Sequence, residues 1–135
     1  MFKKLYSLLL CFLIILASSQ KLQKENDLYY IFKGEYEKDL CTPTNDTGFA
    51  TCELYTFIIK KQYNILKIDG QNVEKEIKIF SKKINKKTYQ IYDNNSKVIG
   101  EIYNLSGNFY LKYNGFLKKA EEKIERNGYK FNKIR

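Results

Sequence analysis

The sequence feature that most constrains the fold is a strand-and-turn rhythm that continues through most of the chain. Apolar and polar residues alternate in short segments, and alternation puts every second side chain on the same face of a β-strand. Asp69-Gly70 and Asn114-Gly115 interrupt the alternation with dipeptides that favour tight hairpin turns. A spacing of about ten residues between segments predicts a mostly β fold, an antiparallel up-and-down meander of about seven to eight strands. We expect strands over 28–38, 53–61, 63–68, 73–81, 87–93, 97–105, 109–113 and 129–134.

The edges of such a meander limit its architecture. An open sheet leaves unpaired edge strands, and closure into a barrel removes them. We therefore expect a small barrel or a curled sheet, with a two-sheet sandwich as the alternative. The segment GFLKKAEEKIERNG departs from alternation, because Leu117, Ala120 and Ile124 are spaced three and four residues apart. With Asn127-Gly128 as a C-cap, it predicts one short C-terminal helix over about 116–126.

The first twenty residues have the organisation of a secretory signal peptide. Two lysines precede an apolar run of about 12 residues, and the small residues Ala17-Ser18-Ser19 follow it. The run is too short to span a bilayer of about 30 Å as a helix, and an uncleaved membrane anchor is the alternative. We expect a signal peptide over 1–19, a flexible N-terminal segment over 20–27 and a single β-rich domain over 28–135. The mature protein is then secreted or resident in the lumen of the secretory pathway, with no transmembrane segment.

Two cysteines, Cys41 and Cys52, remain once a leader carrying Cys11 is removed. In an oxidising compartment an even pair predicts a disulfide, here closing a loop of about a dozen residues worth about 3 kcal/mol. A redox pair is normally spaced Cys-x-x-Cys, and a zinc site needs three or four ligands in a chain that has no histidine. We therefore expect a disulfide, no metal site and no cofactor.

Three Asn-x-Ser/Thr sequences predict N-glycosylation at Asn45, Asn94 and Asn104. The first two fall in expected loops, and Asn104 falls near the end of an expected strand. Their use depends on a eukaryotic origin of the protein.

The residues that most enzymes of this size rely on are missing from the sequence. The absence of histidine excludes Ser-His and Cys-His nucleophiles and an imidazole general base. Many of the acids alternate with lysine, as Glu74 and Glu76 do, which is typical of solvated strand faces. There is no glycine-rich phosphate loop and no tryptophan to stack on sugars. We do not expect an enzyme.

Charge is unevenly distributed in a chain of net charge +9. Residues 21–59 carry four lysines against seven acids, and residues 60–135 carry 18 Lys and Arg against eight acids. A cluster at an expected hairpin tip predicts a basic patch for acidic glycans, lipid head groups or an acidic protein, with nucleic acid excluded by secretion. A solubilising lysine surface is the alternative. The patch residues are Lys82, Lys83, Lys86 and Lys87, with Lys60, Lys61, Lys75 and Lys78 nearby in sequence.

Gly34-Glu35-Tyr36, followed by a meander and a late helix, resembles the lipocalin or calycin pattern, which has tryptophan where this chain has Tyr36. The resemblance implies a barrel that carries a small hydrophobic molecule. The many aromatic residues either line such a cavity or fill a solid core. We therefore predict a small secreted, non-catalytic binding protein with a hydrophobic ligand inside the barrel. The first alternative is a basic surface module for the anionic ligands above, and the second is a structural subunit of an extracellular or luminal assembly.

Overall fold

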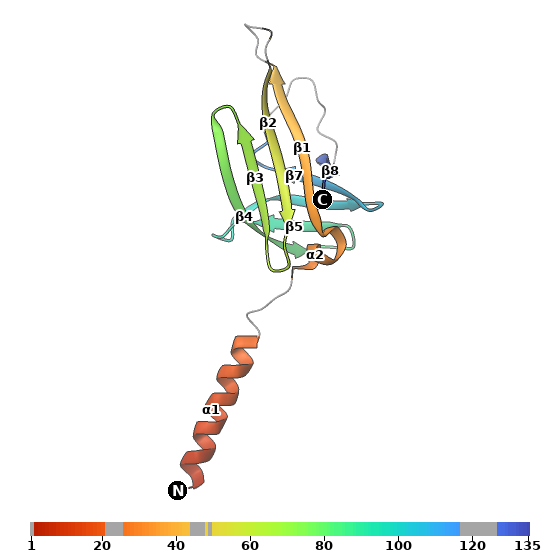
Figure 1. Ribbon diagram of the computed structural model, residues 1–135. Coiled ribbons are helices and arrows are strands. Elements are labelled where there is room, and N and C mark those ends of the chain that lie inside the picture. Colours follow the sequence, from red (N-terminus) through yellow and green to blue (C-terminus); the bar gives the residue numbers. More distant parts are fainter. Residues whose placement is uncertain (1, 21–25, 44–47, 49, 117–126) are drawn as a thin grey trace.

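The computed structural model describes residues 2–20, 26–43, 48, 50–116 and 127–135 (Figure 1). Eight strands form a closed antiparallel barrel in which each strand pairs with its neighbours in chain order. This confirms the predicted mostly β fold and selects the barrel over the sandwich. The strands are β1 (Gly34–Pro43), β2 (Ala50–Ile59), β3 (Asn64–Gly70), β4 (Val73–Lys83), β5 (Thr88–Tyr92), β6 (Val98–Leu105), β7 (Asn108–Tyr113) and β8 (Tyr129–Lys133).

Two sheets share strands to close this barrel. The first seven residues of β4 pair with β3, up to the pair Asn64 and Ile79, and the last four pair with β5, from Phe80 to Lys83. In Figure 1, β1 to β4 run nearly across β5 to β7, so β4 turns from one sheet into the other. The strand β8 performs the same role between β7 and the start of β1. The bend in β4 at Phe80 is the point at which the candidate site forms.

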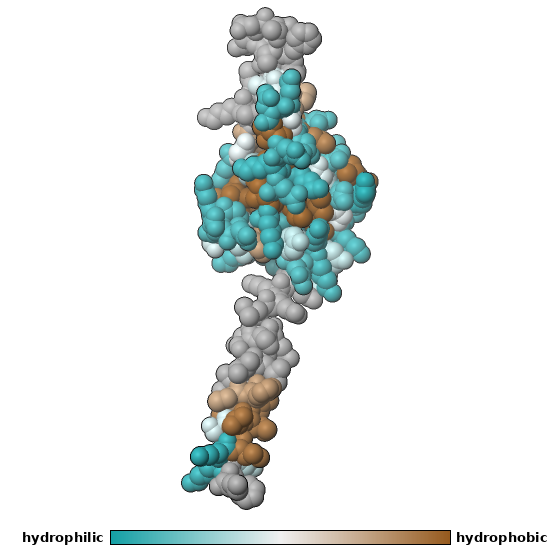
Figure 2. Space-filling model, turned by 60° about the vertical axis from the view of Figure 1, so that its left-hand side comes forward, coloured by the Kyte–Doolittle hydropathy of each residue, from teal (hydrophilic) through white to brown (hydrophobic). Residues whose placement is uncertain are grey.

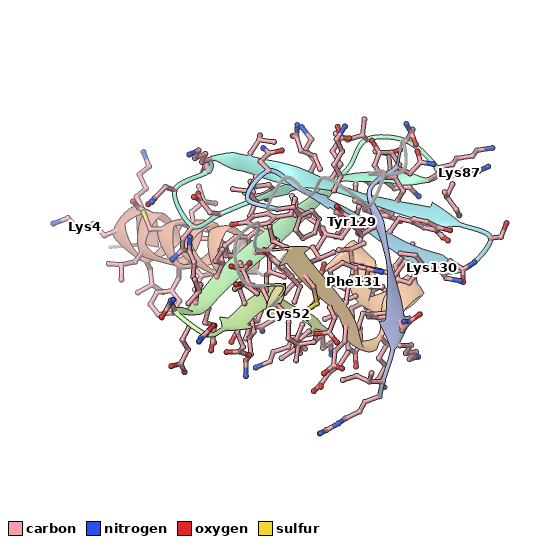
Figure 3. The ribbon with its side chains drawn as sticks, turned by 90° about the horizontal axis from the view of Figure 1, so that it is seen from above. Lys4, Cys52, Lys87, Tyr129, Lys130 and Phe131 are labelled. Carbon is pink, nitrogen blue, oxygen red and sulfur yellow. A yellow bond between two sulfur atoms is a disulfide. The ribbon has the colours of Figure 1, made fainter. Side chains whose placement is uncertain are left out.

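The core is aromatic, and its centre is Phe109 of β7. The ring of Phe109 contacts Phe32, Tyr36, Phe57 and Phe131, with ring centroids 5.2, 4.8, 5.2 and 5.8 Å away. These partners come from α2, β1, β2 and β8, so the ring of Phe109 lies in the barrel interior and contacts elements on several sides of it. Figure 3 shows the same alternation on β8, where Tyr129 and Phe131 point inward while Lys130 points away.

Gly34, which opens the Gly-Glu-Tyr sequence, stands where only glycine fits. Its φ is +134°, and a Cβ atom there would lie 2.2 Å from the carbonyl oxygen of Arg135. The C-terminal backbone therefore packs directly against the start of β1. Tyr36, two residues on, is buried and stacks on Phe109.

Two helices precede the barrel, α1 (Phe2–Gln20) and α2 (Asp27–Phe32). The expected strand over 28–38 is therefore wrong in its first part. Leu28 and Phe32 are four residues apart, so one helical turn buries both in the barrel end, and Asn26 caps that turn by accepting a hydrogen bond from the N–H of Leu28. Because no described strand pairs with residues 27–32, the helix provides the hydrogen bonds of their backbone N–H and C=O groups.

A short C-terminal helix was expected, but both helices of the described residues lie near the N-terminus. Phe116 is not helical, and residues 117–126 lie outside the described residues. Among the helices that are described, none has the length and hydropathy needed to cross a membrane.

The predicted disulfide is present between Cys41 and Cys52, with an S–S distance of 2.08 Å. The two residues face each other across β1 and β2. The bridge therefore joins the two strands next to their connecting hairpin.

Candidate anion-binding surface

The up-and-down topology gathers alternate turns at one end of the barrel. Residues 60–63 connect β2 to β3, residues 84–87 connect β4 to β5, and residues 106–107 connect β6 to β7. These three turns, α2 and the C-terminal residues after β8 meet at the end that we call the α2 end (Figure 1). Segments far apart in the sequence thus share one surface.

Exposed cations concentrate at the α2 end. In the part of the chain that the structure describes, none of these ammonium groups has a carboxylate within ion-pair distance, while Glu35 is 3.9 Å from Arg135. Around the turns of the opposite end, charges of both signs are present, such as Asp69, Asp93 and Lys97. Within the described residues, exposed lysines without a nearby carboxylate are therefore collected at the α2 end. The exposed lysines of the α2 end are Lys33, Lys60, Lys61, Lys82, Lys83, Lys86 and Lys87.

The predicted basic patch forms a defined turn, residues 82–87, which we call the lysine tip. The Oδ1 atom of Asn85 accepts hydrogen bonds from the N–H groups of Lys87 and Thr88, each at 3.0 Å. Asparagine favours such turns because its side chain replaces a backbone acceptor. The tip therefore presents its ammonium groups from a backbone that is held in place.

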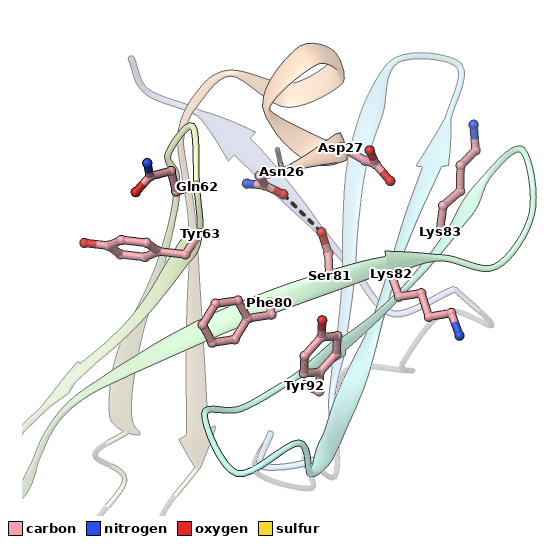
Figure 4. Close-up of a pocket in the computed structure, with 9 residues that line it drawn as sticks. All are labelled: Asn26, Asp27, Gln62, Tyr63, Phe80, Ser81, Lys82, Lys83 and Tyr92. Atoms are coloured by element: carbon pink, nitrogen blue, oxygen red, sulfur yellow. Dashed lines mark hydrogen bonds between the residues drawn. The ribbon is translucent and has the colours of Figure 1, made fainter. Parts of the chain in front are cut away.

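A pocket of about 240 Å³ lies beside the lysine tip, between α2 and β4 (Figure 4). Asn26 and Asp27 of the α2 segment form one side, and Ser81, Lys82 and Lys83 of β4 form another. The aromatic rings of Tyr63, Phe80 and Tyr92 complete the lining, together with Gln62. The pocket therefore combines flat apolar surface, hydrogen-bonding groups, two cations and the carboxylate of Asp27.

Cations and aromatic rings are interleaved outside this pocket. The Nζ atom of Lys78 lies 4.3 Å from the ring centroid of Tyr63 and 5.5 Å from that of Phe80, and Lys60 lies 5.7 Å from Tyr63. Phe80 stacks on its cross-strand neighbour Tyr92, with centroids 5.8 Å apart. Figure 2 shows apolar surface bordered by hydrophilic side chains on the flank of the barrel that it brings forward. Cation–π contact orients the two lysines beside the rings.

Asn26 fastens α2 to the strands that form the pocket. Its Nδ2 atom donates to Oδ1 of Asn64 at 2.6 Å and to the carbonyl of Lys60 at 2.8 Å. Its Oδ1 atom accepts from Oγ of Ser81 at 3.1 Å, as Figure 4 marks. Asn26 is 7% exposed, although the sequence put it in a flexible segment, and Asn64 is fully buried. One buried side chain thus joins the ends of β2, β3 and β4 to the helix.

The structure brings together only part of the lysine set suggested by the sequence. Lys60 and Lys78 converge on Tyr63 near the tip. Lys75 does not join them, because it lies seven residues before Lys82 along β4, or about 23 Å at 3.3 Å per residue. Sequence reasoning missed α2, although an Asn followed by Leu28 and Phe32 at helical spacing is a detectable signal.

The three predicted glycosylation sites stay predictions. Asn94 is exposed in the turn between β5 and β6. Asn104 is half-buried near the end of β6, where its Oδ1 accepts a hydrogen bond from Gly107. Asn45 lies outside the described residues.

Aromatic side chains occupy the barrel interior in the described part of the chain. Beyond the rings around Phe109, the ring of Phe116 contacts Tyr55, Tyr113 and Tyr129 with centroids 4.9, 5.5 and 5.1 Å away. Aromatic contacts thus run from α2 to the far end of the barrel. This arrangement is that of a packed core.

A second hollow, of about 350 Å³, lies on the outer face of β3 and β4, where acids and lysines alternate. The described residues include no group of three or more side chains of the ligand type that could hold a metal ion.

Comparison of the chain with protein-family models, with curated proteins and with solved structures finds no match. The lipocalin-like pattern of Gly34 to Tyr36 therefore stays a resemblance, and the function has to be argued from the site itself.

Proposed function

We propose that this protein is a small, secreted, non-catalytic binding protein whose ligand is anionic and binds to the outside of the barrel at the α2 end. One observation carries the proposal, the collection at that end of exposed lysines that have no ion-pair partner among the residues the structure describes. Lys33 directly after α2, the lysines of the β2–β3 turn and the lysines of the tip contribute to it, although the outermost of them are separated by more than fifty positions in the sequence. The disulfide between Cys41 and Cys52 supports an oxidising compartment.

The energetics of such a surface support a ligand that carries several charges. A single exposed ion pair contributes at most about 1 kcal/mol, so one charge would bind weakly. A polyanion or a charged surface contacts several lysines at once and gains about 1 kcal/mol from each. Four lysines at the tip then correspond to at most about a 10³-fold change in affinity.

A hydrophobic ligand inside the barrel stays a prediction. The rings around Phe109 and Phe116 fill the described interior positions. The outer surface is for that reason the better-supported site.

Retention on immobilised heparin tests the proposal. We expect the combined replacement of Lys82, Lys83, Lys86 and Lys87 by Gln to lower the salt concentration of elution strongly. The matched control replaces Lys67, Lys75, Lys97 and Lys112, which carry the same charge away from the lysine tip, and it should elute close to the unmodified protein. Equal losses in the two variants would refute a defined site, since they would mean that only net charge matters.

A further inference from the structure

Exposed apolar side chains accompany the lysines of the α2 end. Large hydrophobic side chains on the surface of a small protein are ordinary when they are scattered. Here Tyr30 and Ile31 of α2 are 65% and 43% exposed, and Ile84 of the lysine tip is 53% exposed. These three side chains are borne by two projections of the same end, α2 and the lysine tip, and we call the three together the apolar crest.

The local sequence places exposed apolar side chains and lysines next to one another. Ile84 has Lys82 and Lys83 before it and Lys86 and Lys87 after it, all exposed. On α2, the two positions that face the core are Leu28 and Phe32, so Tyr30 and Ile31 lie on the outward face. Neither projection gains stability from exposing these apolar groups to water, since their transfer out of water is favourable.

A bilayer that carries anionic lipids matches both properties of the crest. Its surface charge attracts lysines within about a Debye length, and its interface accepts aromatic and aliphatic side chains. A soluble polyanion matches the lysines alone and leaves Tyr30, Ile31 and Ile84 in water. The chain enters the barrel at Asn26, at this same end.

We infer that the α2 end docks onto anionic membrane surfaces, with Tyr30, Ile31 and Ile84 entering the interface between the lysines. This inference rests on the proposed function and specifies its ligand. The long axis of the barrel then stands away from the membrane, and the disulfide-bonded hairpin of β1 and β2 faces the solvent. The aromatic rings of Tyr63, Phe80 and Tyr92 flank the docked end.

Vesicle binding by the protein recovered from a secreting host tests the inference. We expect sedimentation with phosphatidylcholine vesicles that contain phosphatidylserine, and none with phosphatidylcholine alone. The triple variant Tyr30→Ser, Ile31→Ser, Ile84→Ser should bind at least roughly tenfold more weakly, because it loses apolar area that leaves water on docking. Its retention on heparin should not change, which also verifies that it is folded. The control Val98→Ser shortens a side chain of 45% exposure at the start of β6, at the opposite end, and it should bind as the unmodified protein does.

A spectroscopic reporter checks the orientation directly, because the chain has no tryptophan. Ile84→Trp should shift its emission to the blue when vesicles with phosphatidylserine are added, and Val98→Trp should not. Vesicle binding that the triple variant retains in full would overturn the inference. Heparin retention without any vesicle binding would also overturn it, in favour of a soluble polyanion, and would leave the proposed function standing. Loss of the proposed function itself would appear as heparin retention that ignores the lysine tip.

Discussion

The side chain of Asn26 stabilises the α2 end, and its replacement by alanine tests that role. Asn26→Ala removes the N-cap of α2 together with the hydrogen bonds to Asn64, to the carbonyl of Lys60 and to Ser81. Asn64 is fully buried, and among the described residues its Nδ2 atom has no partner. The variant therefore leaves a buried amide group without its hydrogen bond.

The expected cost is the sum of two contributions. Loss of an Asn N-cap costs about 1 kcal/mol. Leaving the buried acceptor of Asn64 unsatisfied costs about 2 kcal/mol, whereas Lys60 and Ser81 are partly exposed and recover hydrogen bonds to water. The free energy of unfolding should therefore fall by about 3 kcal/mol. For a domain of this size, this loss corresponds to a decrease of about 12 °C in the melting temperature.

Urea and thermal unfolding followed by circular dichroism measure this loss. Asn85→Ala is the matched control, because the side chain of Asn85 accepts two backbone hydrogen bonds in an exposed turn. We expect the control to lose less than about 1 kcal/mol. Replacing Asn64 by Leu in the Asn26→Ala background should recover part of the stability, since both polar partners are then gone. If Asn26→Ala costs no more than Asn85→Ala, the assignment of Asn26 as a buried link is refuted.

Two further predictions concern the far end of the barrel. Replacement of Cys41 and Cys52 by alanine should lower the free energy of unfolding by about 3 kcal/mol, measured from urea midpoints, and two reactive thiols in the native protein would contradict the disulfide. Burial, helped by the hydrogen bond to Glu53, raises the pKa of Tyr55 above its usual range. The tyrosine of the unfolded chain ionises near pH 10, whereas Tyr55 of the folded protein stays neutral there. The contribution of Tyr55 to the free energy of unfolding is therefore fully present below about pH 10 and is lost as the pH rises above it. The fall should be shallower in Tyr55→Phe, and equal slopes for the two proteins would exclude this contribution.

Sequence reasoning succeeded where the signal is local. The alternation of apolar residues predicted most strands, since strand faces repeat every second residue whatever the partner strand is. The turn predicted at Asp69-Gly70 was wrong by two residues, because Asp69 and Gly70 still pair with β4 and the turn is formed by Gln71 and Asn72. The disulfide followed from cysteine count and compartment. Reasoning failed at 28–32, where an apolar, aromatic segment suited a strand equally well and only the open barrel end selected a helix.

Only part of the candidate site could be predicted from the sequence. The lysines of the tip are contiguous in the sequence and could be found by inspection. The crest needs Tyr30 and Ile31 from one segment and Ile84 from another, and no sequence period links segments more than fifty residues apart. The pocket likewise depends on Asn26 reaching the ends of three strands.

The sequence by itself determined the class of fold, the cross-link and the excess of positive charge, because these depend on composition and on neighbours along the chain. The tertiary structure alone decided which charges and apolar groups meet. Barrel closure sends every second turn to the same end, so Lys33 beside α2 and the lysines of the β2–β3 turn and of the lysine tip converge there. Asp69 and Glu74, at the end of β3 and the start of β4, are directed to the opposite end by the same geometry.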